Sequence, residues 1–479
     1  MSSLEERRVT AAPSTGRPLR LWTVAGLVLT AVGSVAAARP ASSPLPGPPP
    51  VVLDDDGGWC WFQDERVIVV GKRLVFGSVA AGRHAPERRG AVEATAVDLE
   101  TGAISRVRLS EAPIPPAGTY DDHNAPALAV RGDGRLLAVY AGHGVENRFR
   151  YRISARPGDA AEWGPERSFA PSESSRITYS NLHRLSEAGG RIYNFFRGLD
   201  DLFKPSVAWS DDGGESWASG GVVIDVPSEV RHRPYVKYAS DGRDSVHLVY
   251  TEGHPRDFDN GVFHVVLRDG RLLRSDATPV ASLSEGLAEP RLGTRVFEGG
   301  ADDVAWVADL ELDAAGRPFA AYSIQKGSAG LPPGQGGSDH RYRLARWTGA
   351  RWQDEEIAFA GTRLYPGEDD YTGGIALVPG DPDTVFLSTN ADPATGLPLS
   401  SASDGRRHWE IFRGDRDGAR RGAAAASPWR WTPVTQDSTQ DNLRPVVPRT
   451  ASGEPIVLWL RGRYRGYTDY DLEVVGRFR

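Results

Sequence analysis

Seven copies of one strand–turn–strand pattern, frequent turn residues and the lack of any long helical period predict an all-β protein. The predicted fold is a single-domain, seven-bladed β-propeller of four-stranded antiparallel blades. The chain has 479 residues, of which 54 are Gly and 35 are Pro. That content is too high for a helix bundle, yet below the roughly 25–30% of Pro plus Gly that marks low-complexity chains. Radially closed β folds reach this length as one domain.

The repeat is a short apolar strand, a turn with Gly beside Asp or Arg, and a stronger apolar strand that ends in polar residues. Its seven copies span residues 59–82, 123–144, 179–198, 232–254, 303–325, 371–391 and 441–462. Alternating or continuous apolar runs such as Val246–Tyr250 are typical of strands. A second hairpin after several copies supplies two more strands. We expect residues 50–55 to add the outer strand that the last blade lacks, which closes the ring.

Residues 210–217 match the Asp-box pattern Ser-x-Asp-x-Gly-x-x-Trp, between two predicted outer strands. In such a loop the Asp side chain accepts turn amides, Gly takes a positive φ and Trp packs between sheets. The motif therefore supports the architecture and identifies no substrate.

The amino-terminal segment has the pattern of an export signal. Four Arg residues precede an uncharged run, Leu21–Ala38, that ends in three Ala. We expect residues 1–38 to be a secretory signal peptide and the protein to be secreted. The alternative is an uncleaved membrane anchor, because the run approaches spanning length. Residues 39–50 form a Pro-rich linker, and residues 51–479 the catalytic propeller domain.

Charge and cysteine content exclude several classes. A net charge of −7 argues against a protein that binds nucleic acid or a membrane surface. One Cys excludes an intramolecular disulfide and a Cys-rich zinc module. We expect a monomer without a protein partner.

Polar residues gather at one end of the predicted hairpins. The start of a hairpin's first strand lies beside the end of its second, so these ends meet at one mouth of the ring. The candidate catalytic residues there are His123, His143, Tyr179 and Arg197. The candidate substrate-binding residues are Asn124, Arg176, Asn181, Arg233, Tyr235 and His254.

The residue types at this mouth suit β-elimination better than hydrolysis. His and Tyr serve as general acids and bases, and Arg binds a carboxylate through two parallel hydrogen bonds. One Arg, a neutralising His and a Tyr base fit β-elimination from a uronic acid. Hydrolysis would instead want two opposed carboxylates. Acidic residues in repeats five and six, such as Asp303 and Asp370, keep hydrolysis open. Each candidate also has a structural explanation, such as a turn cap for His123 or a buried aromatic for Tyr179.

Several segments resemble a known family. Residues 58–66, Gly-Trp-Cys-Trp-Phe-Gln-Asp-Glu-Arg, look like the opening signature of BNR-repeat propellers that include the ulvan lyases of polysaccharide lyase families 24 and 25. Segments 121–127, 140–144, 178–182, 195–198 and 233–235 resemble active-site segments of family 25. Glu65 departs from the pattern, which has Pro there.

The resemblance implies an anionic polysaccharide substrate, ulvan or a similar rhamnose–glucuronate polymer, cleaved between sulfated rhamnose and a uronic acid. It implies acid–base roles for His123 and Tyr179, carboxylate neutralisation by His143 and Arg197, and sugar positioning by Tyr235. The chemistry needs no cofactor, although some relatives hold a structural zinc or calcium. Two alternatives stay open: a glycoside hydrolase of the α-L-rhamnosidase or sialidase type on the same propeller, and a non-catalytic carbohydrate-binding propeller.

Overall fold

The computed structural model describes residues 49–478 except 117, 200–202, 226–232, 418–426 and 452. These residues belong to one compact unit, Ser42–Arg479. The predicted signal peptide (1–38), most of the linker (39–50) and His232, at the predicted start of the fourth repeat, lie outside the described residues. No helix in the described part of the chain is long and apolar enough to cross a membrane.

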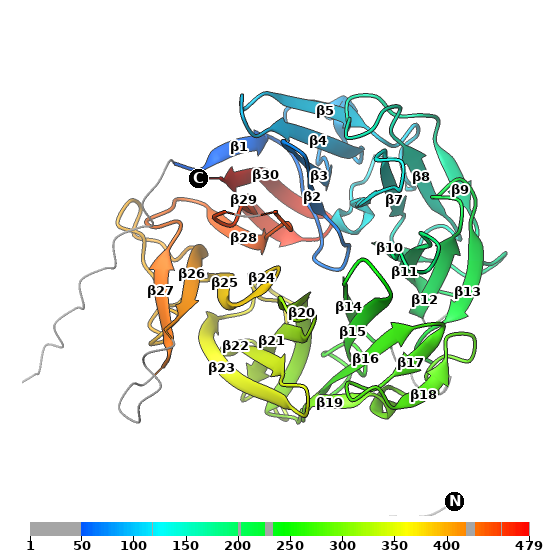
Figure 1. Ribbon diagram of the computed structural model, residues 1–479. Coiled ribbons are helices and arrows are strands. Elements are labelled where there is room, and N and C mark those ends of the chain that lie inside the picture. The colour runs from blue at the N-terminus through cyan, green and yellow to red at the C-terminus, as the bar shows by residue number, and fades with distance from the viewer. Residues whose placement is uncertain are drawn as a thin grey trace, which may run out of the picture. The chain divides into compact units, whose positions relative to one another are not determined.

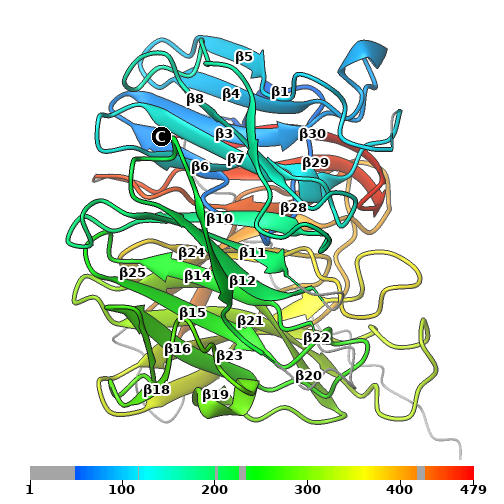
Figure 2. The same cartoon turned by 90° about the vertical axis from the view of Figure 1, so that its right-hand side faces the viewer.

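Seven antiparallel sheets, counted over the described residues, follow one another around a central axis. Figure 1 shows this ring face-on and Figure 2 shows it from the side. The predicted seven-bladed β-propeller is therefore confirmed, and all seven predicted repeats form the inner hairpins of the blades. Blade 1 begins at β2, and the blades are numbered along the chain.

The strands of each blade lie side by side from the axis outward. The innermost strands are β2 (Val67–Val70), β6 (Ala127–Val130), β10 (Thr178–Arg184), β14 (Val236–Ser240), β20 (Asp303–Leu312), β24 (Ile375–Val378) and β28 (Asp441–Val446). The second strands are β3 (Arg73–Val79), β7 (Leu136–Ala141), β11 (Ile192–Gly198), β15 (Ser245–Thr251), β21 (Pro318–Lys326), β25 (Asp381–Thr389) and β29 (Val457–Gly466).

The third strands are β4 (Val92–Asp98), β8 (Phe149–Ile153), β12 (Lys204–Ser210), β16 (Val262–Arg268), β22 (His340–Trp347), β26 (Glu410–Arg416) and β30 (Asp469–Arg477). The outer strands are β5 (Ile104–Arg108), β9 (Arg167–Phe169), β13 (Ala218–Val222), β17 (Arg271–Leu273), β18 (Pro279–Ser282), β19 (Thr294–Phe297), β23 (Trp352–Gly361), β27 (Trp429–Pro433) and β1 (Val51–Asp54). Three short 3-10 helices are η1 (Pro86–Arg88), η2 (Asp122–Asn124) and η3 (Pro290–Leu292).

Burial explains the sequence patterns of these strands. All residues of β7 and β15 are buried, because both faces of a second strand pack against neighbouring blades. Residues of β8, farther from the axis, alternate between buried and partly exposed. The outer strand β5 is largely exposed. The core therefore lies between the blades, around their inner and middle strands.

Blade 4 departs from the four-strand prediction at its outer edge. Its third strand, β16, pairs with β17 near its end and with β19 near its start. Strand β18 adds to β17, so this sheet has six strands. The segment between β17 and β19 divides the outer strand into two pieces, which the repeat pattern did not indicate.

The ring closes as expected. Strand β1 pairs antiparallel with β30, with Val51 opposite Gly476 and Val52 opposite Val475. The first described strand thus completes the sheet formed by the last three. No disulfide takes part, since Cys60 is a free thiol.

The Asp box forms the expected turn between β12 and β13. The Oδ1 atom of Asp212 accepts hydrogen bonds from the amides of Glu215 (3.0 Å) and Ser216 (2.9 Å). Gly214 has a φ of +95°. The Trp217 ring lies 5.1 Å from the ring of Phe149 in the preceding blade. The motif therefore joins neighbouring blades and lies outside the mouth of the ring.

Candidate active site

The predicted mouth residues of blades 2 and 3 come together. Helix η2, which carries His123, precedes β6, and His143 follows β7. Tyr179 lies at the start of β10 and Arg197 near the end of β11, where Thr178 is opposite Arg197. The ring centroid of Tyr179 is 5.5 Å from that of His123 and 6.4 Å from that of His143.

Two imidazoles share one carboxylate at the centre of this site. The rings of His123 and His143 stack with centroids 3.9 Å apart and planes 9° apart. The Nδ1 atom of His123 is 2.7 Å from Oδ1 of Asp121, and the Nδ1 atom of His143 is 2.9 Å from Oδ2. A carboxylate only accepts hydrogen bonds, so each Nδ1 carries a proton. Each Nε2 atom is then the nitrogen left for substrate chemistry.

The groups around the two imidazole rings favour a positive charge on one ring and a neutral state of the other. Burial opposes a charge on His123, but the acidic groups around it, Cys60, Tyr179, Asp121 and Asp122, raise the pKa of its imidazole well above the usual value. Burial and the charge of His123 lower the pKa of His143. Burial acts against ionisation of Asp121, yet the two histidines bring its pKa below the usual range. The cluster therefore holds a carboxylate, a charged His123 and a neutral His143.

The two histidine side chains also differ in the fraction of their surface that is exposed to solvent. The His123 side chain is 7% exposed and that of His143 is 30% exposed. The main-chain amide of His143 donates to Oδ1 of Asn124 at 2.9 Å, which fixes the loop after β7. His143 thus presents the accessible neutral Nε2, while the charged ring of His123 lies beneath it.

Tyr179 and Arg197 form the other half of the site. The Cζ atom of Arg197 lies 5.4 Å from the Tyr179 ring centroid and 4.2 Å from that of Tyr235. Its Nε donates to the carbonyl of Phe203 at 3.1 Å. In the described part of the chain no carboxylate pairs with Arg197, although the residue is buried. Its charge is therefore available to an anionic substrate group.

Tyr179 is held in an unusual backbone conformation. Its φ is +66°, in the left-handed region that costs a residue with a side chain about 1–3 kcal/mol. The register of β10 and β11 shifts between Thr178 and Asn181 at this point. Burial raises the pKa of the Tyr179 hydroxyl well above its usual value, despite the opposing charges of His123 and Arg197. The phenol is thus a proton donor in the resting site.

The signature segment before β2 lies beneath these residues. The Phe62 ring is 5.7 Å from that of Tyr179 and 4.8 Å from that of Tyr235. Trp306 lies edge-on to Tyr235 at 5.3 Å. Phe62 and Trp306, from blades 1 and 5, thus pack against the tyrosines of blades 3 and 4.

The remaining predicted binding residues divide into two groups. The rings of His254 and Tyr235 lie edge-on at 5.4 Å, and Arg233 lies 5.6 Å from the Phe203 ring, both near Arg197. Burial and neighbouring arginines lower the pKa of His254 to about 2, so its ring is neutral. Asn181 instead donates within the sheet to the carbonyl of Phe195 at 3.2 Å, and this bond keeps its amide away from the mouth.

Arg176, the last predicted binding residue, is exposed just before β10. It lies beside the start of β10, which carries Tyr179, and its part in substrate binding stays a prediction.

Blade 7 contributes residues whose role the sequence pattern did not indicate. Arg444 donates to Asp122 Oδ2 at 2.5 Å and to the Tyr464 hydroxyl at 2.7 Å. The hydroxyl of Tyr464 in turn donates to Asp122 Oδ2 at 2.8 Å. Tyr467, in the turn after β29, lies edge-on to His123 at 5.0 Å. These contacts cross the closure of the ring, so spacing along the chain gives no signal for them.

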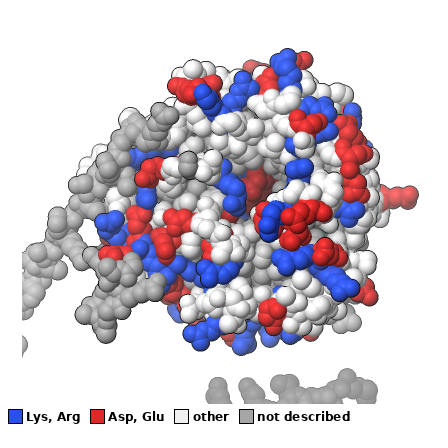
Figure 3. Space-filling model, in the orientation of Figure 1, with Lys and Arg blue, Asp and Glu red and all other residues white. Residues whose placement is uncertain are grey.

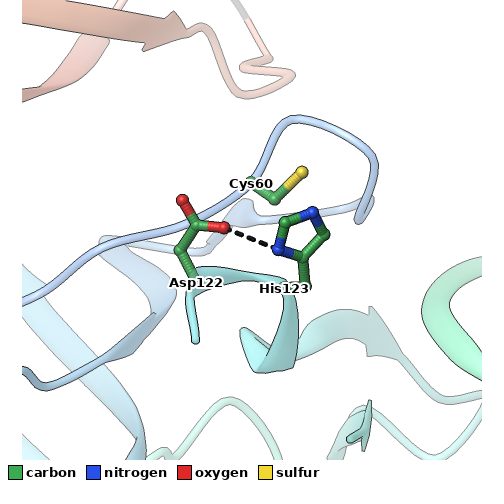
Figure 4. A group of neighbouring side chains, drawn as sticks. All are labelled: Cys60, Asp122 and His123. Atoms are coloured by element: carbon green, nitrogen blue, oxygen red, sulfur yellow. Dashed lines mark ion pairs between the residues drawn. The ribbon is translucent and has the colours of Figure 1, made fainter. Parts of the chain in front are cut away.

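Among the described residues, two side-chain triads have donors close enough to hold a metal ion: Cys60, Asp122 and His123, and Asp121, His123 and His143. Figure 4 shows the first, in which Cys60 and the Asp122–His123 pair point toward one another. Neither fits the structural zinc or calcium that the resemblance allows, because a structural zinc takes four protein ligands and each triad offers three. Both Nδ1 atoms are already bonded to carboxylates, and Arg444 already neutralises Asp122. Calcium would also need six to eight oxygen ligands.

Charge is mixed over the face seen in Figure 3, where basic and acidic side chains alternate around a central hollow. No single-sign patch dominates this view.

Similarity to known proteins shows the family to which this chain belongs. The family described as BNR repeat-containing family member matches residues 59–360, so the chain belongs to it. Among curated proteins none matches by sequence. The structure is similar to that of a PL25 ulvan lyase bound to -[GlcA(1-4)Rha3S]-, with a TM-score of 0.63 and 15% identity over 89% of this chain and 95% of that one.

A second structure of PL25 ulvan lyase matches with a TM-score of 0.62, 15% identity and the same coverage. An α-L-arabinofuranosidase from Fusarium graminearum matches with a TM-score of 0.41 and 13% identity over 73% of this chain and 91% of that one. At 15% identity the likeness to the two PL25 structures shows a shared propeller fold.

Proposed function

We propose that this protein is a secreted polysaccharide lyase that cleaves the bond between a rhamnose, sulfated in ulvan, and a uronic acid by β-elimination. One observation carries the proposal: the stacked His123 and His143 share Asp121 and lie beside Tyr179 and an arginine without a carboxylate partner among the described residues. The likeness to a lyase bound to -[GlcA(1-4)Rha3S]- supports the substrate class.

The arrangement supplies each group that β-elimination needs. Arg197 and the charged His123 balance the substrate carboxylate, which acidifies the neighbouring C5 proton. The Nε2 atom of neutral His143 takes that proton. The electrons of the C5–H bond form the C4=C5 double bond as the C4–O bond breaks. The Tyr179 hydroxyl gives its proton to the departing oxygen, and a proton then returns from His143 to Tyr179 through solvent.

This assignment exchanges the two histidines relative to the sequence-based expectation. That expectation gave acid–base chemistry to His123 and carboxylate neutralisation to His143. The pKa of His123 is raised and that of His143 is lowered, so the positive charge belongs on His123. A group that must accept a proton works best when neutral and accessible, which describes His143.

Product chemistry tests the proposal directly. Digestion of ulvan by a lyase generates a conjugated C4=C5 product whose ultraviolet absorbance rises with time. A hydrolase releases reducing ends without that absorbance, and a carbohydrate-binding propeller gives neither. Reducing ends without ultraviolet absorbance on ulvan and on a panel of glucuronate polymers would contradict the lyase proposal.

One observation favours the hydrolase alternative. Asp370, before β24, is buried, and burial followed by the charges of Asp369 and Glu368 raises the pKa of its carboxyl to about 7. A carboxyl group that stays protonated near neutral pH suits the general acid of a glycosidase. Asp370→Asn should then abolish hydrolysis, whereas the lyase proposal predicts that ultraviolet product formation continues in this variant.

The amino-terminal pattern supports secretion. The test is amino-terminal sequencing of the protein recovered from the culture medium of an expressing cell. A start near residue 39 is expected, and recovery of the intact chain in the membrane fraction would instead indicate an anchor.

A further inference from the structure

A cleft beside the two histidines has no part in the reaction described above. Its volume is about 370 Å³, within the roughly 300–1,000 Å³ that is usual for ligand sites. His143, Asp121 and Asn124 line one side, and Arg89 and Tyr120 line the other. The cleft therefore adjoins His143, one of the two stacked histidines.

Arg89 is held in place on the far side of this cleft. Its Cζ atom lies 4.6 Å from the centroid of the Tyr120 ring. Its Nε donates to the carbonyl of Gly118 at 2.6 Å, and its Nη1 donates to that of Ala81 at 3.2 Å. Tyr120 is itself fixed, with its ring edge-on to Tyr470 at 4.7 Å. A guanidinium fixed in this way loses little conformational entropy when it binds a ligand.

The charge of Arg89 is not compensated within the described residues. Two arginines of the same loop are paired: Arg83 with Asp471, and Arg88 with Glu93. For Arg89 the described part of the chain offers no carboxylate, and its Nη2 makes no hydrogen bond there. Asp121 also lines the cleft, but the two imidazoles already bind both of its oxygens. The net character of the cleft is therefore positive.

We propose that this cleft binds the sugar on the opposite side of the scissile bond from the uronic acid, through an oxyanion on that sugar at Arg89. The oxyanion is a sulfate ester, because the sugar there is a rhamnose, whose C6 is a methyl group, and a guanidinium binds a sulfate through two parallel hydrogen bonds. The proposal rests on the proposed lyase function. Around the ring, Arg89 in blade 1 and Arg197 in blade 3 flank the histidines of blade 2, so the site is built for a polymer with charges on both sides of the broken bond.

The test compares sulfated ulvan with chemically desulfated ulvan. For Arg89→Ala we expect KM to rise about tenfold or more, the usual effect of losing a hydrogen bond to a charged group, with kcat unchanged. Arg83→Ala is the matched control, an exposed arginine of the same loop already paired with Asp471, and its KM should equal that of the unaltered protein.

Each outcome decides a point. A KM increase confined to sulfated ulvan assigns a sulfate to Arg89, whereas an equal increase on both polymers overturns the assignment, because desulfated rhamnose carries no oxyanion. A KM within twofold of the unaltered protein on both polymers overturns the proposal. If Arg89→Ala lowers Tm, Arg89→Gln, which keeps an amide donor for the loop carbonyls, takes its place.

Failure of the lyase proposal can be distinguished from failure of the Arg89 proposal. In that case the unaltered protein forms no ultraviolet-absorbing product from either polymer. Calorimetric binding of sulfated and desulfated ulvan oligosaccharides to the unaltered protein and to Arg89→Ala then still tests the cleft. Equal Kd values for the two proteins would overturn the inference without reference to catalysis.

Discussion

Replacing Asp121 by Asn tests the centre of the site with the smallest change in shape. The carboxylate accepts from Nδ1 of His123 at 2.7 Å and from Nδ1 of His143 at 2.9 Å. An amide offers one acceptor oxygen and one donor nitrogen, so one imidazole must move its proton to Nε2 or lose its partner. If that ring is His143, its Nε2 can no longer accept the C5 proton.

The size of the effect follows from these two contacts. A hydrogen bond to a charged group contributes about 1.5–3 kcal/mol, so loss of one of the two corresponds to a fall in kcat of about 10–10². Removal of the negative charge also lowers the pKa of His123. The alkaline limb of kcat/KM should therefore move to lower pH, because the reaction requires this ring to be charged.

The assay is the ultraviolet rate on ulvan from pH 5 to pH 10, with Tm measured for each variant. Asp133→Asn, a change at an exposed aspartate in the distant turn of the same blade, is the control and should leave kcat unchanged. Asp121→Glu should recover part of the rate. A kcat for Asp121→Asn within threefold of the unaltered protein, with the same pH profile, would refute the role of the shared carboxylate.

Three further predictions concern chemistry and stability. Tyr179→Phe, which removes the proton donor, and His123→Ala, which removes a charge that balances the substrate carboxylate, should each lower kcat by about 10²–10⁴ in the same ultraviolet assay; near-normal rates in both would contradict the site assignment. Arg444→Met removes the guanidinium that pairs with the buried Asp122 and should destabilise the fold by about 3–5 kcal/mol in urea unfolding, whereas an unchanged midpoint would argue against the ion pair. Burial, then the charge of Asp64, raises the pKa of Glu65 from 4.5 to about 7, so the folded state binds more protons in that interval and stability should fall as pH rises from 4.5 to 7. Glu65→Gln should flatten this dependence of Tm, and an identical pH profile in the variant would show that another group is responsible.

Much of the fold follows from sequence pattern because each inner hairpin is local. The seven repeats, the turn at Ser210–Trp217 and the closing strand at Val51–Asp54 were all predictable from short apolar runs and their turns. The divided outer strand of blade 4 was not, since the segment between β17 and β19 carries no repeat. Nothing in a strand pattern states where an inserted segment rejoins a sheet.

The sequence predicted which residues lie at the strand ends around the mouth, but it did not predict which side chains contact one another there. The rule that strand starts and ends meet at the mouth brought His123, His143, Tyr179 and Arg197 together. It also selected Asn181, whose amide bonds within the sheet because the register shifts there. The choice of Asp121 as shared partner, and the contact of Arg444 with Asp122 across 322 residues, depend on side-chain directions that spacing does not determine.

The pairing of β1 with β30 sets the order in which this protein can be assembled. Val51 and Gly476 must meet before the last sheet is complete, so the molecule stays unfinished until its final strand has been synthesised. Bringing such distant segments together is the slow kind of step in folding, because the entropy of closing the long loop is lost before the contact is gained. The catalytic mouth depends on that step too: Arg444 and Tyr464, which hold Asp122, belong to the blade that closes last. A chain cut short by even one strand would therefore lack an ordered site as well as a closed ring.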